Sequence, residues 1–198
     1  MDYKEYFRRI YEVEDPWHYG TSLFEKVRFG AMTEFALACS PETVLDLGCG
    51  EGHFLEYLLR RAPGLRVTAV ELEPVAAARC QARLAQYGVS LHVMDLVDFL
   101  APRRPADSGL YDVAVCGDVL YYLPPQVVST QVVPGVAHLV RSGGGLVLSY
   151  ADANDHEWSL KVFRSRFKLE KRVYIKPVQD PPPWPWMVAL LAKEGSRA

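Results

Sequence analysis

The stretch that decides the fold is TVLDLGCGEGHFLEYLL, residues 43–59. A short, mostly apolar run leads into Asp46, and Gly48, Gly50 and Gly52 follow at alternate positions. A helical apolar pattern begins directly after Gly52. Gly48 and Gly50 lack side chains, so a ligand can approach the backbone, and Gly52 lets the helix start close to the strand. The stretch predicts a buried strand, a ligand-binding glycine turn and a helix.

The rest of the chain repeats this alternation of strand and helix. Two helices are predicted over 74–87 and 127–140, the second broken near Pro134. Strand patterns occur at 43–47, 66–72, 90–96, 111–118, 143–150, 167–175 and 186–192. Alternation predicts an α/β, Rossmann-like, seven-stranded and mostly parallel sheet with helices on both faces. The connection between the last two strands is too short for a helical crossover, so the last strand is expected to run antiparallel.

The N-terminal part predicts a helical lid. Residues 1–40 form two helical patterns separated by EDPWHYG, with Thr21 or Ser22 as the cap of the second helix. That helix is expected to turn apolar residues toward the core: Phe24, Val27, Ala31, Phe35 and Leu37. We expect one domain over 1–198, with a cap (1–40), a cofactor-binding core (41–150) and C-terminal strands completing the sheet (151–198).

Composition narrows the classes of partner. Of the 198 residues, 49% are apolar and the net charge is −2, which disfavours a nucleic-acid partner. The sequence contains neither a secretory leader nor an 18-residue apolar run, so a cytoplasmic protein without a membrane partner is expected, as a monomer or homodimer. Four scattered cysteines without a histidine cluster predict reduced thiols and no metal site.

Acidic residues stand where the other predicted strands end. Glu71 ends the second strand, 21 positions after Gly50, where a carboxylate can accept hydrogen bonds from ribose hydroxyls. Asp95 ends the third strand beside Leu96, and Gly117–Asp118 end the fourth. The carboxyl ends of parallel strands share one edge, so these residues predict a nucleoside site. Its members are Asp46, Gly48, Cys49, Gly50, Gly52, Glu71, Leu72, Asp95, Leu96, Gly117 and Asp118.

The spacing within the loop indicates which nucleoside binds. The pattern is G-x-G-x-G, the loop contains no Lys or Arg, and Asp46 precedes it by two positions. Such a loop is unfavourable for the negative charges of a pyrophosphate. It is favourable for S-adenosylmethionine, which carries positive charge. Five segments resemble successive motifs of class I S-adenosylmethionine-dependent methyltransferases over residues 40–150: VLDLGCGEG, VTAVELEP, HVMDLVDF, YDVAVCGDVLYYL and LVRSGGGLVLSY.

A narrower resemblance lies in the lid. DPWHYGTSLFEKVRFGAM (15–32) and DVLYYLP (118–124) are similar to the NodS-like N-methyltransferases, which methylate the free amine of a glucosamine-terminated oligosaccharide. The resemblance implies S-adenosylmethionine as cofactor, S-adenosylhomocysteine as product and a small-molecule acceptor. It also implies that Trp17 and Tyr19 cover the cofactor and that Arg28 binds the methionine carboxylate. Residues after Tyr150 depart from the family pattern, so the acceptor stays open.

Several residues are candidates to hold or take the acceptor's proton. Asp118 ranks first, beside the expected methyl group, followed by Tyr121, Tyr122 and His156; His18 and His53 could also reach the site. The leading interpretation is methyl transfer to an amine, or a hydroxyl, of a sugar or secondary metabolite. An RNA or protein methyltransferase and a non-catalytic S-adenosylmethionine-binding protein remain as alternatives.

Overall fold

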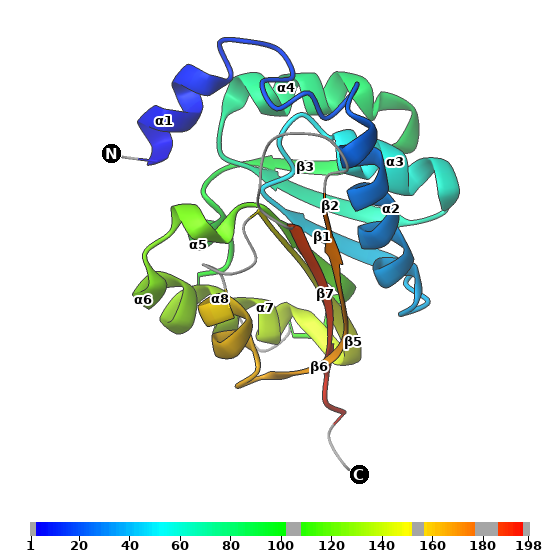
Figure 1. Ribbon diagram of the computed structural model, residues 1–198, viewed down its shortest axis with the longest axis vertical. Helices are drawn as coiled ribbons and strands as arrows, with labels where there is room; N and C mark the ends of the chain where they lie inside the picture. The colour runs from blue at the N-terminus through cyan, green and yellow to red at the C-terminus, as the bar shows by residue number, and fades with distance from the viewer. Residues whose placement is uncertain (1–2, 102–107, 152–156, 177–185, 196–198) are drawn as a thin grey trace.

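The structure is a computed structural model that describes residues 3–101, 108–151, 157–176 and 186–195. One mixed sheet has the strand order β3-β2-β1-β4-β5-β7-β6 (Figure 1). Its strands are β1 Thr43–Leu47, β2 Arg66–Glu71, β3 Ser90–Val93, β4 Tyr111–Gly117, β5 Val140–Tyr150, β6 Phe167–Ile175 and β7 Trp186–Lys193. β7 runs antiparallel to both of its neighbours, β5 and β6, and the other pairs in the sheet are parallel. The predicted fold class is confirmed.

Helices cover both faces of the sheet (Figure 1). The helices are α1 Tyr3–Ile10, α2 Leu23–Leu37, α3 His53–Arg61, α4 Pro74–Arg83, α5 Leu96–Phe99, α6 Pro125–Val127, α7 Val133–Leu139 and α8 Glu157–Phe163. Shorter helical turns are η1 Ala85–Tyr87, η3 Leu120–Tyr122 and the π-helical η4 Val128–Val132. One buried cluster packs α2, α3 and α4 on the sheet, and another packs α5, α7 and α8. The predicted apolar face of α3 is buried in the first cluster.

The direction of the chain across the sheet reverses at β1. β2 pairs with one edge of β1 and β4 with the other, both in parallel. Ligands bind at such a switch point, beside the carboxyl ends of the strands. The loop after β1 and the loop after β4 therefore lie next to each other, as the site requires.

The helix predicted over 74–87 is divided into α4 and η1, and the predicted ends of β2, β4 and β7 are each wrong by one residue. Three other differences are larger or have a clear cause. β3 ends at Val93 because Asp95 caps α5, with its side chain accepting the Val97 backbone N–H. β5 begins at Val140 rather than at residue 143. The helix predicted to break near Pro134 continues instead: η4 leads directly into α7, and Pro134 lies in the first turn of α7. The π-helical turn η4 directly before it marks a local departure from the regular i→i−4 hydrogen bonds, which proline cannot complete.

The buried face of α2 was predicted wrongly in part. Ser22 caps the helix as expected, accepting the Glu25 backbone N–H. However, Val27 is 59% exposed. The residues that α2 buries are Glu25, Arg28, Phe29, Met32, Thr33 and Ala36. Glu25 and Arg28 form an ion pair on the buried face, at positions where apolar residues were expected. The cavity described below borders this face, and a residue of its wall pairs with the charge of Arg28.

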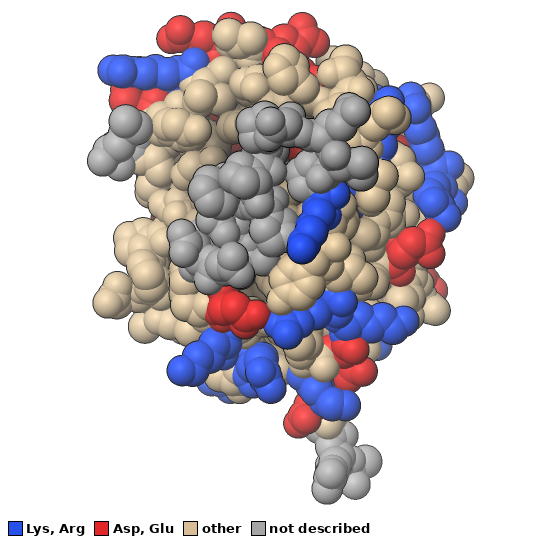
Figure 2. Space-filling model, in the orientation of Figure 1, with Lys and Arg blue, Asp and Glu red and all other residues tan. Residues whose placement is uncertain are grey.

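Basic side chains gather around α8 and β6, at the end of the molecule away from α1 (Figure 1). Figure 2 shows Lys and Arg over its lower part, where α8 and β6 lie. From α8 to β6 the exposed basic residues are Lys161, Arg164, Arg166, Lys168, Lys171 and Arg172. β6 is an edge strand, and charge along an edge opposes pairing with other chains. Within the described ranges, no helix combines the length and apolar character needed to cross a membrane.

Candidate active site

A cavity of about 540 Å³ opens at the carboxyl edge of β1, β2 and β4. The loop after β1, the ends of β2 and β4, and the N-terminal lid all contribute to its wall. The predicted residues that line it are Trp17, His18, Tyr19, Arg28, Asp46, Gly48, Cys49, Gly50, His53, Glu71, Leu72, Asp95, Leu96, Gly117, Asp118, Tyr121 and Tyr122. Gly52 begins α3 behind the wall. His156 lies outside the described residues.

The glycine loop has the backbone that its sequence predicts. Gly48, Gly50 and Gly52 have φ values of 81°, 55° and 80°, in the left-handed region that only glycine adopts readily. A side chain at Gly50 would lie 2.9 Å from the Tyr11 hydroxyl, inside the cavity wall. The Gly48 N–H is bonded to the carbonyl of Val70 at 2.8 Å. The loop is thus held against β2 and leaves its backbone open to a ligand.

Glu71 is built into this loop. It is 5% exposed, and its oxygens accept the N–H of Gly50 at 2.8 Å and of Glu73 at 2.9 Å. Burial raises the pKa of Glu71, and the backbone hydrogen bonds oppose that rise. Each carboxylate oxygen can accept a further bond, so the group can still receive two hydroxyls from the cavity.

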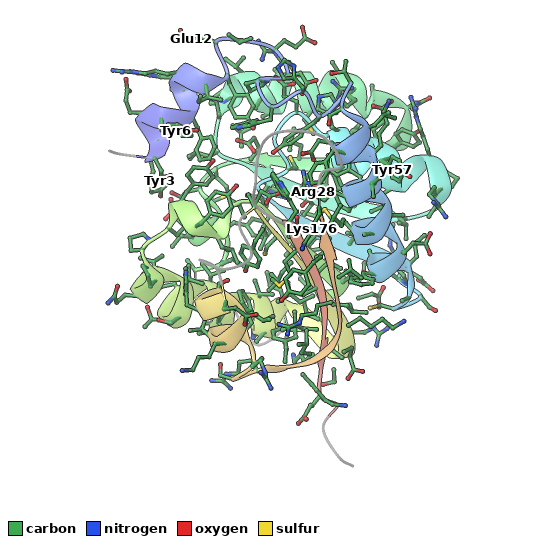
Figure 3. All side chains as sticks on the ribbon, viewed as in Figure 1. Tyr3, Tyr6, Glu12, Arg28, Tyr57 and Lys176 are labelled. Atoms are coloured by element: carbon green, nitrogen blue, oxygen red, sulfur yellow. The ribbon has the colours of Figure 1, made fainter. Side chains whose placement is uncertain are left out.

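Asp95 joins the rim to the lid. Its Oδ2 accepts the Tyr3 hydroxyl at 2.5 Å and lies 3.2 Å from Lys4 Nζ. Although burial acts to raise the pKa of Asp95, the hydrogen bonds from Tyr3, Val97 and Lys4 hold it below its ordinary value. Figure 3 labels Tyr3 on α1, close to the start of α5. No residue of α1 is fully buried, so apolar packing contributes little to its position. The contacts of Tyr3 and Lys4 with Asp95 therefore help to hold the helix over the site.

Asp46 is the unbalanced charge of the site. It is 3% exposed, and its carboxyl has no hydrogen-bond or ion-pair partner among the described residues. Burial, followed by the charge of Glu71, raises the pKa of Asp46 to about 7. A buried carboxylate without a partner is costly, so a ligand carrying positive charge or N–H donors is favoured beside it.

Arg28 ties the lid helix α2 to the end of β4. It is 2% exposed, and its Nη1 binds Asp118 Oδ2 and the Ser149 hydroxyl, the latter at 3.0 Å. Nε and Nη2 bind Glu25 Oε2 at 2.7 and 2.5 Å. Burial alone would lower the pKa of Arg28, but Asp118 and Glu25 raise it. The cluster holds two carboxylates against one guanidinium, and Figure 3 shows Arg28 near the centre of the molecule.

Asp118 has a constrained geometry. Its φ of 55° is left-handed, and its N–H donates to the Ser149 carbonyl at 2.9 Å. Its Oδ1 accepts the N–H of Ala151 at 3.0 Å. These bonds and Arg28 fix the carboxylate at the cavity wall, where its orientation is set before a ligand arrives.

Aromatic rings close the cavity from the lid side. Trp17 stacks on Tyr19 with 5.6 Å between ring centroids, and Tyr19 lies 5.5 Å from the Arg28 guanidinium. Tyr122 packs against Phe7 of α1 at 4.7 Å and against Tyr121 at 4.6 Å. Burial raises the pKa of Tyr121 and of Tyr122, so both hydroxyls stay protonated near neutral pH. They can donate hydrogen bonds but are poor bases.

His53 belongs to a polar cluster that joins the lid to the glycine loop. Asp15, Glu51 and His53 bring ligand atoms within 4.8 Å of one another, a spacing that could hold a cation. However, Asp15 accepts the N–H groups of Tyr19 and Gly20, and Glu51 accepts Arg79 at 2.7 Å. Burial, followed by the charge of Arg83, lowers the pKa of His53. The cluster therefore holds residues 15–20 in place by bonds that it already makes.

Some residues of the site were not predicted. Glu25 was not predicted to belong to the site, although its spacing from Arg28 fits a helical ion pair. Tyr3 and Phe7 of α1, with Tyr11 directly after it, line the cavity, and their i, i+4 spacing was a signal for one shared face. The ring centroid of Trp186, on β7, lies 4.7 Å from the Arg28 guanidinium. No local sequence pattern predicts that contact.

The family model of nodulation protein S (NodS) matches residues 1–161. NodS of Sinorhizobium fredii is 31% identical over 147 residues, covering 73% of this chain and 65% of that protein. The ubiquinone biosynthesis O-methyltransferase of Pectobacterium carotovorum is 32% identical over 147 residues, covering 73% and 57%. The chain thus spans somewhat less than two thirds of the length of these curated relatives.

Solved structures agree with the fold. The N-methyltransferase NodS from Bradyrhizobium japonicum WM9, in complex with S-adenosylhomocysteine, superposes with a TM-score of 0.81 at 22% identity, over 98% of this chain and 99% of that one. A 1,6-didemethyltoxoflavin-N1-methyltransferase from Burkholderia thailandensis gives 0.74 at 17% identity, over 97% and 87%. The architecture is that of the Rossmann-like class I methyltransferases. Within that class, the chain belongs to the NodS family.

Proposed function

We propose that this protein transfers a methyl group from S-adenosylmethionine to an amine of a small molecule, such as an amino sugar or a secondary metabolite. The observation that carries the proposal is the ring of buried acids around one cavity: Asp46, Glu71, Asp95 and Asp118. Such a ring fits a ligand with a nucleoside at one end and positive charge at the other. Membership of the NodS family, and the N-methyltransferase name of the superposed structure, support an amine as acceptor.

The residues present fit the cofactor part by part. Glu71 has two free acceptor positions for ribose hydroxyls, and Asp95 with Leu96 lies where an adenine would be bound. Asp46 fits the cationic amino-acid end, because its own charge has no other partner in the described chain. Nη2 of Arg28 keeps one further N–H beyond its bond to Glu25, which can reach a carboxylate. S-adenosylmethionine would supply a methyl group that is already activated for transfer.

The chain's own task is to bind the acceptor, orient it and exclude water. The lid rings Trp17 and Tyr19, together with Tyr122 of η3, shield the cavity. Asp118, held by Arg28 and Ala151, can accept a hydrogen bond from the acceptor amine and orient its lone pair. A neutral amine needs little activation, so alignment by a fixed carboxylate is the main contribution asked of the protein. The protonated Tyr121 hydroxyl can bind an oxygen of the acceptor beside it.

Two measurements test the proposal. Isothermal titration with S-adenosylmethionine and S-adenosylhomocysteine should show binding of both. A labelled-methyl assay on matched panels of amino sugars and phenols should then show transfer to amines in preference to hydroxyls. Absence of binding to either cofactor form would refute the methyltransferase proposal. Binding without transfer to any acceptor would favour a non-catalytic role, and transfer only to phenols would refute the amine assignment.

A further inference from the structure

Two cysteines from different elements meet beside the cavity. Cys49 lies between Gly48 and Gly50 in the glycine loop, and Cys80 lies on α4, 31 positions later. Their sulfur atoms are 3.7 Å apart, which is van der Waals contact for two thiols. Of the two, Cys49 lines the cavity and is partly exposed, whereas Cys80 is buried. The functional assignment above gives this pair no role.

A disulfide would require the sulfurs to approach by roughly 1.7 Å, since the S–S bond measures about 2.05 Å. Cys80 cannot supply that movement easily: a side chain at Gly52 would come within 2.8 Å of its sulfur, so it is packed against the loop. Cys49 can move more easily, because it borders the cavity and the glycines on either side, Gly48 and Gly50, can adopt a wider range of backbone angles than other residues. Closure would therefore draw the glycine loop toward α4.

That movement would disturb bonds on which the cofactor site depends. The Cys49 N–H donates to the Val70 carbonyl at 3.1 Å, and the neighbouring Gly50 N–H donates to Glu71 at 2.8 Å. Stretching these bonds displaces the loop backbone and releases Glu71 from its orientation. The geometry points to Cys49 and Cys80 as a modification site: a peroxide converts the pair to a disulfide, and the disulfide form binds S-adenosylmethionine more weakly. This inference rests on the proposed function.

The chemistry balances with a peroxide as the two-electron oxidant. Cys49 Sγ gives its proton to solvent and attacks one oxygen of the O–O bond, forming a sulfenic acid and releasing hydroxide. Cys80 Sγ then gives up its proton and attacks the sulfenic sulfur, the S–S bond forms, and the second oxygen leaves as hydroxide. The two protons released by the thiols combine with the two hydroxides. Two thiols and one hydrogen peroxide thus give one disulfide and two waters. A dithiol reductant reverses the change by thiol–disulfide exchange.

The environment keeps the pair reduced until an oxidant reaches it. The hydrogen bond with Cys80, and then burial, raise the pKa of Cys49 well above its ordinary value. The thiol is therefore mostly protonated, and mild oxidants act slowly on it. A cofactor that fills the cavity would cover the exposed side of Cys49, so binding and oxidation should exclude each other.

The test combines mass, mapping and affinity. Reduced protein is treated with hydrogen peroxide, with and without S-adenosylhomocysteine. We expect the intact mass to fall by about 2 Da, as one disulfide forms, and a peptide map to join Cys49 to Cys80. Titration should show at least a tenfold weaker affinity for S-adenosylhomocysteine, on the scale of one lost hydrogen bond. Dithiothreitol should restore that affinity, and bound ligand should slow the crosslink.

Cys80→Ala is the matched control, and Cys80→Ser repeats it with a side chain closer in size. Both should bind like the reduced protein and keep their affinity after peroxide. Three results would each overturn the inference. They are no crosslink in the wild type, a crosslink that leaves the affinity unchanged, and a loss of affinity in both variants equal to that of the wild type. Reduced protein that does not bind S-adenosylhomocysteine at all would instead overturn the proposed function, and the crosslink could still be measured.

Discussion

Replacement of Glu71 by alanine tests the site most directly. Its two oxygens already accept the N–H groups of Gly50 and Glu73 at 2.8 and 2.9 Å, and each can accept one bond more. Hydrogen bonds to a charged group contribute about 1.5–3 kcal/mol each. Water can replace part of the loss, so we take about 3 kcal/mol for the pair. The dissociation constant of S-adenosylhomocysteine should then rise about 100-fold.

Isothermal titration at constant pH and salt measures this change. Glu170→Ala is the matched control, since Glu170 is an exposed acid on β6 that pairs with Lys168. The control should bind like the wild type. If Glu71→Ala folds normally and its affinity stays within threefold of the wild-type value, Glu71 does not hold the ligand, and the reasoning that places a ribose at the end of β2 is wrong.

Three further changes probe other parts of the structure. Asp46→Asn should unfold at higher urea than the wild type at pH 8 but not at pH 4, because a carboxyl whose pKa rises from 3.8 to about 7 on folding loses its stabilising proton as the pH rises. Tyr3→Phe removes the lid's bond to Asp95 and should weaken S-adenosylhomocysteine binding three- to tenfold by titration, on the scale of about 1 kcal/mol. Asp112→Asn breaks the pair with Arg141 and should lower the free energy of unfolding by about 2 kcal/mol at pH 7. Folding lowers the pKa of Asp112, so its carboxylate stops stabilising the fold when it is protonated. In urea titrations, the difference in free energy of unfolding between Asp112→Asn and the wild type should therefore shrink as the pH falls below about 4.

Prediction from sequence succeeded where one element carries its own signal. β6 has the predicted bounds, because its pattern and flanking residues mark both ends locally. The glycine loop was also predicted, since its φ values demand residues without side chains. Prediction failed for the buried face of α2. Its inward ion pair is stable only because Asp118, 90 positions later, meets Arg28 inside the fold.

Sequence by itself determined the alternation of strand and helix, the glycine turn and the acids at the strand ends, because each depends on neighbouring residues and on one shared edge of a parallel sheet. Only the tertiary structure decided which groups meet across that edge. It paired Arg28 with Asp118, placed α1 over Asp95, and brought Cys49 against Cys80. These contacts join segments 31 to 92 positions apart, where packing rather than local propensity decides the partner.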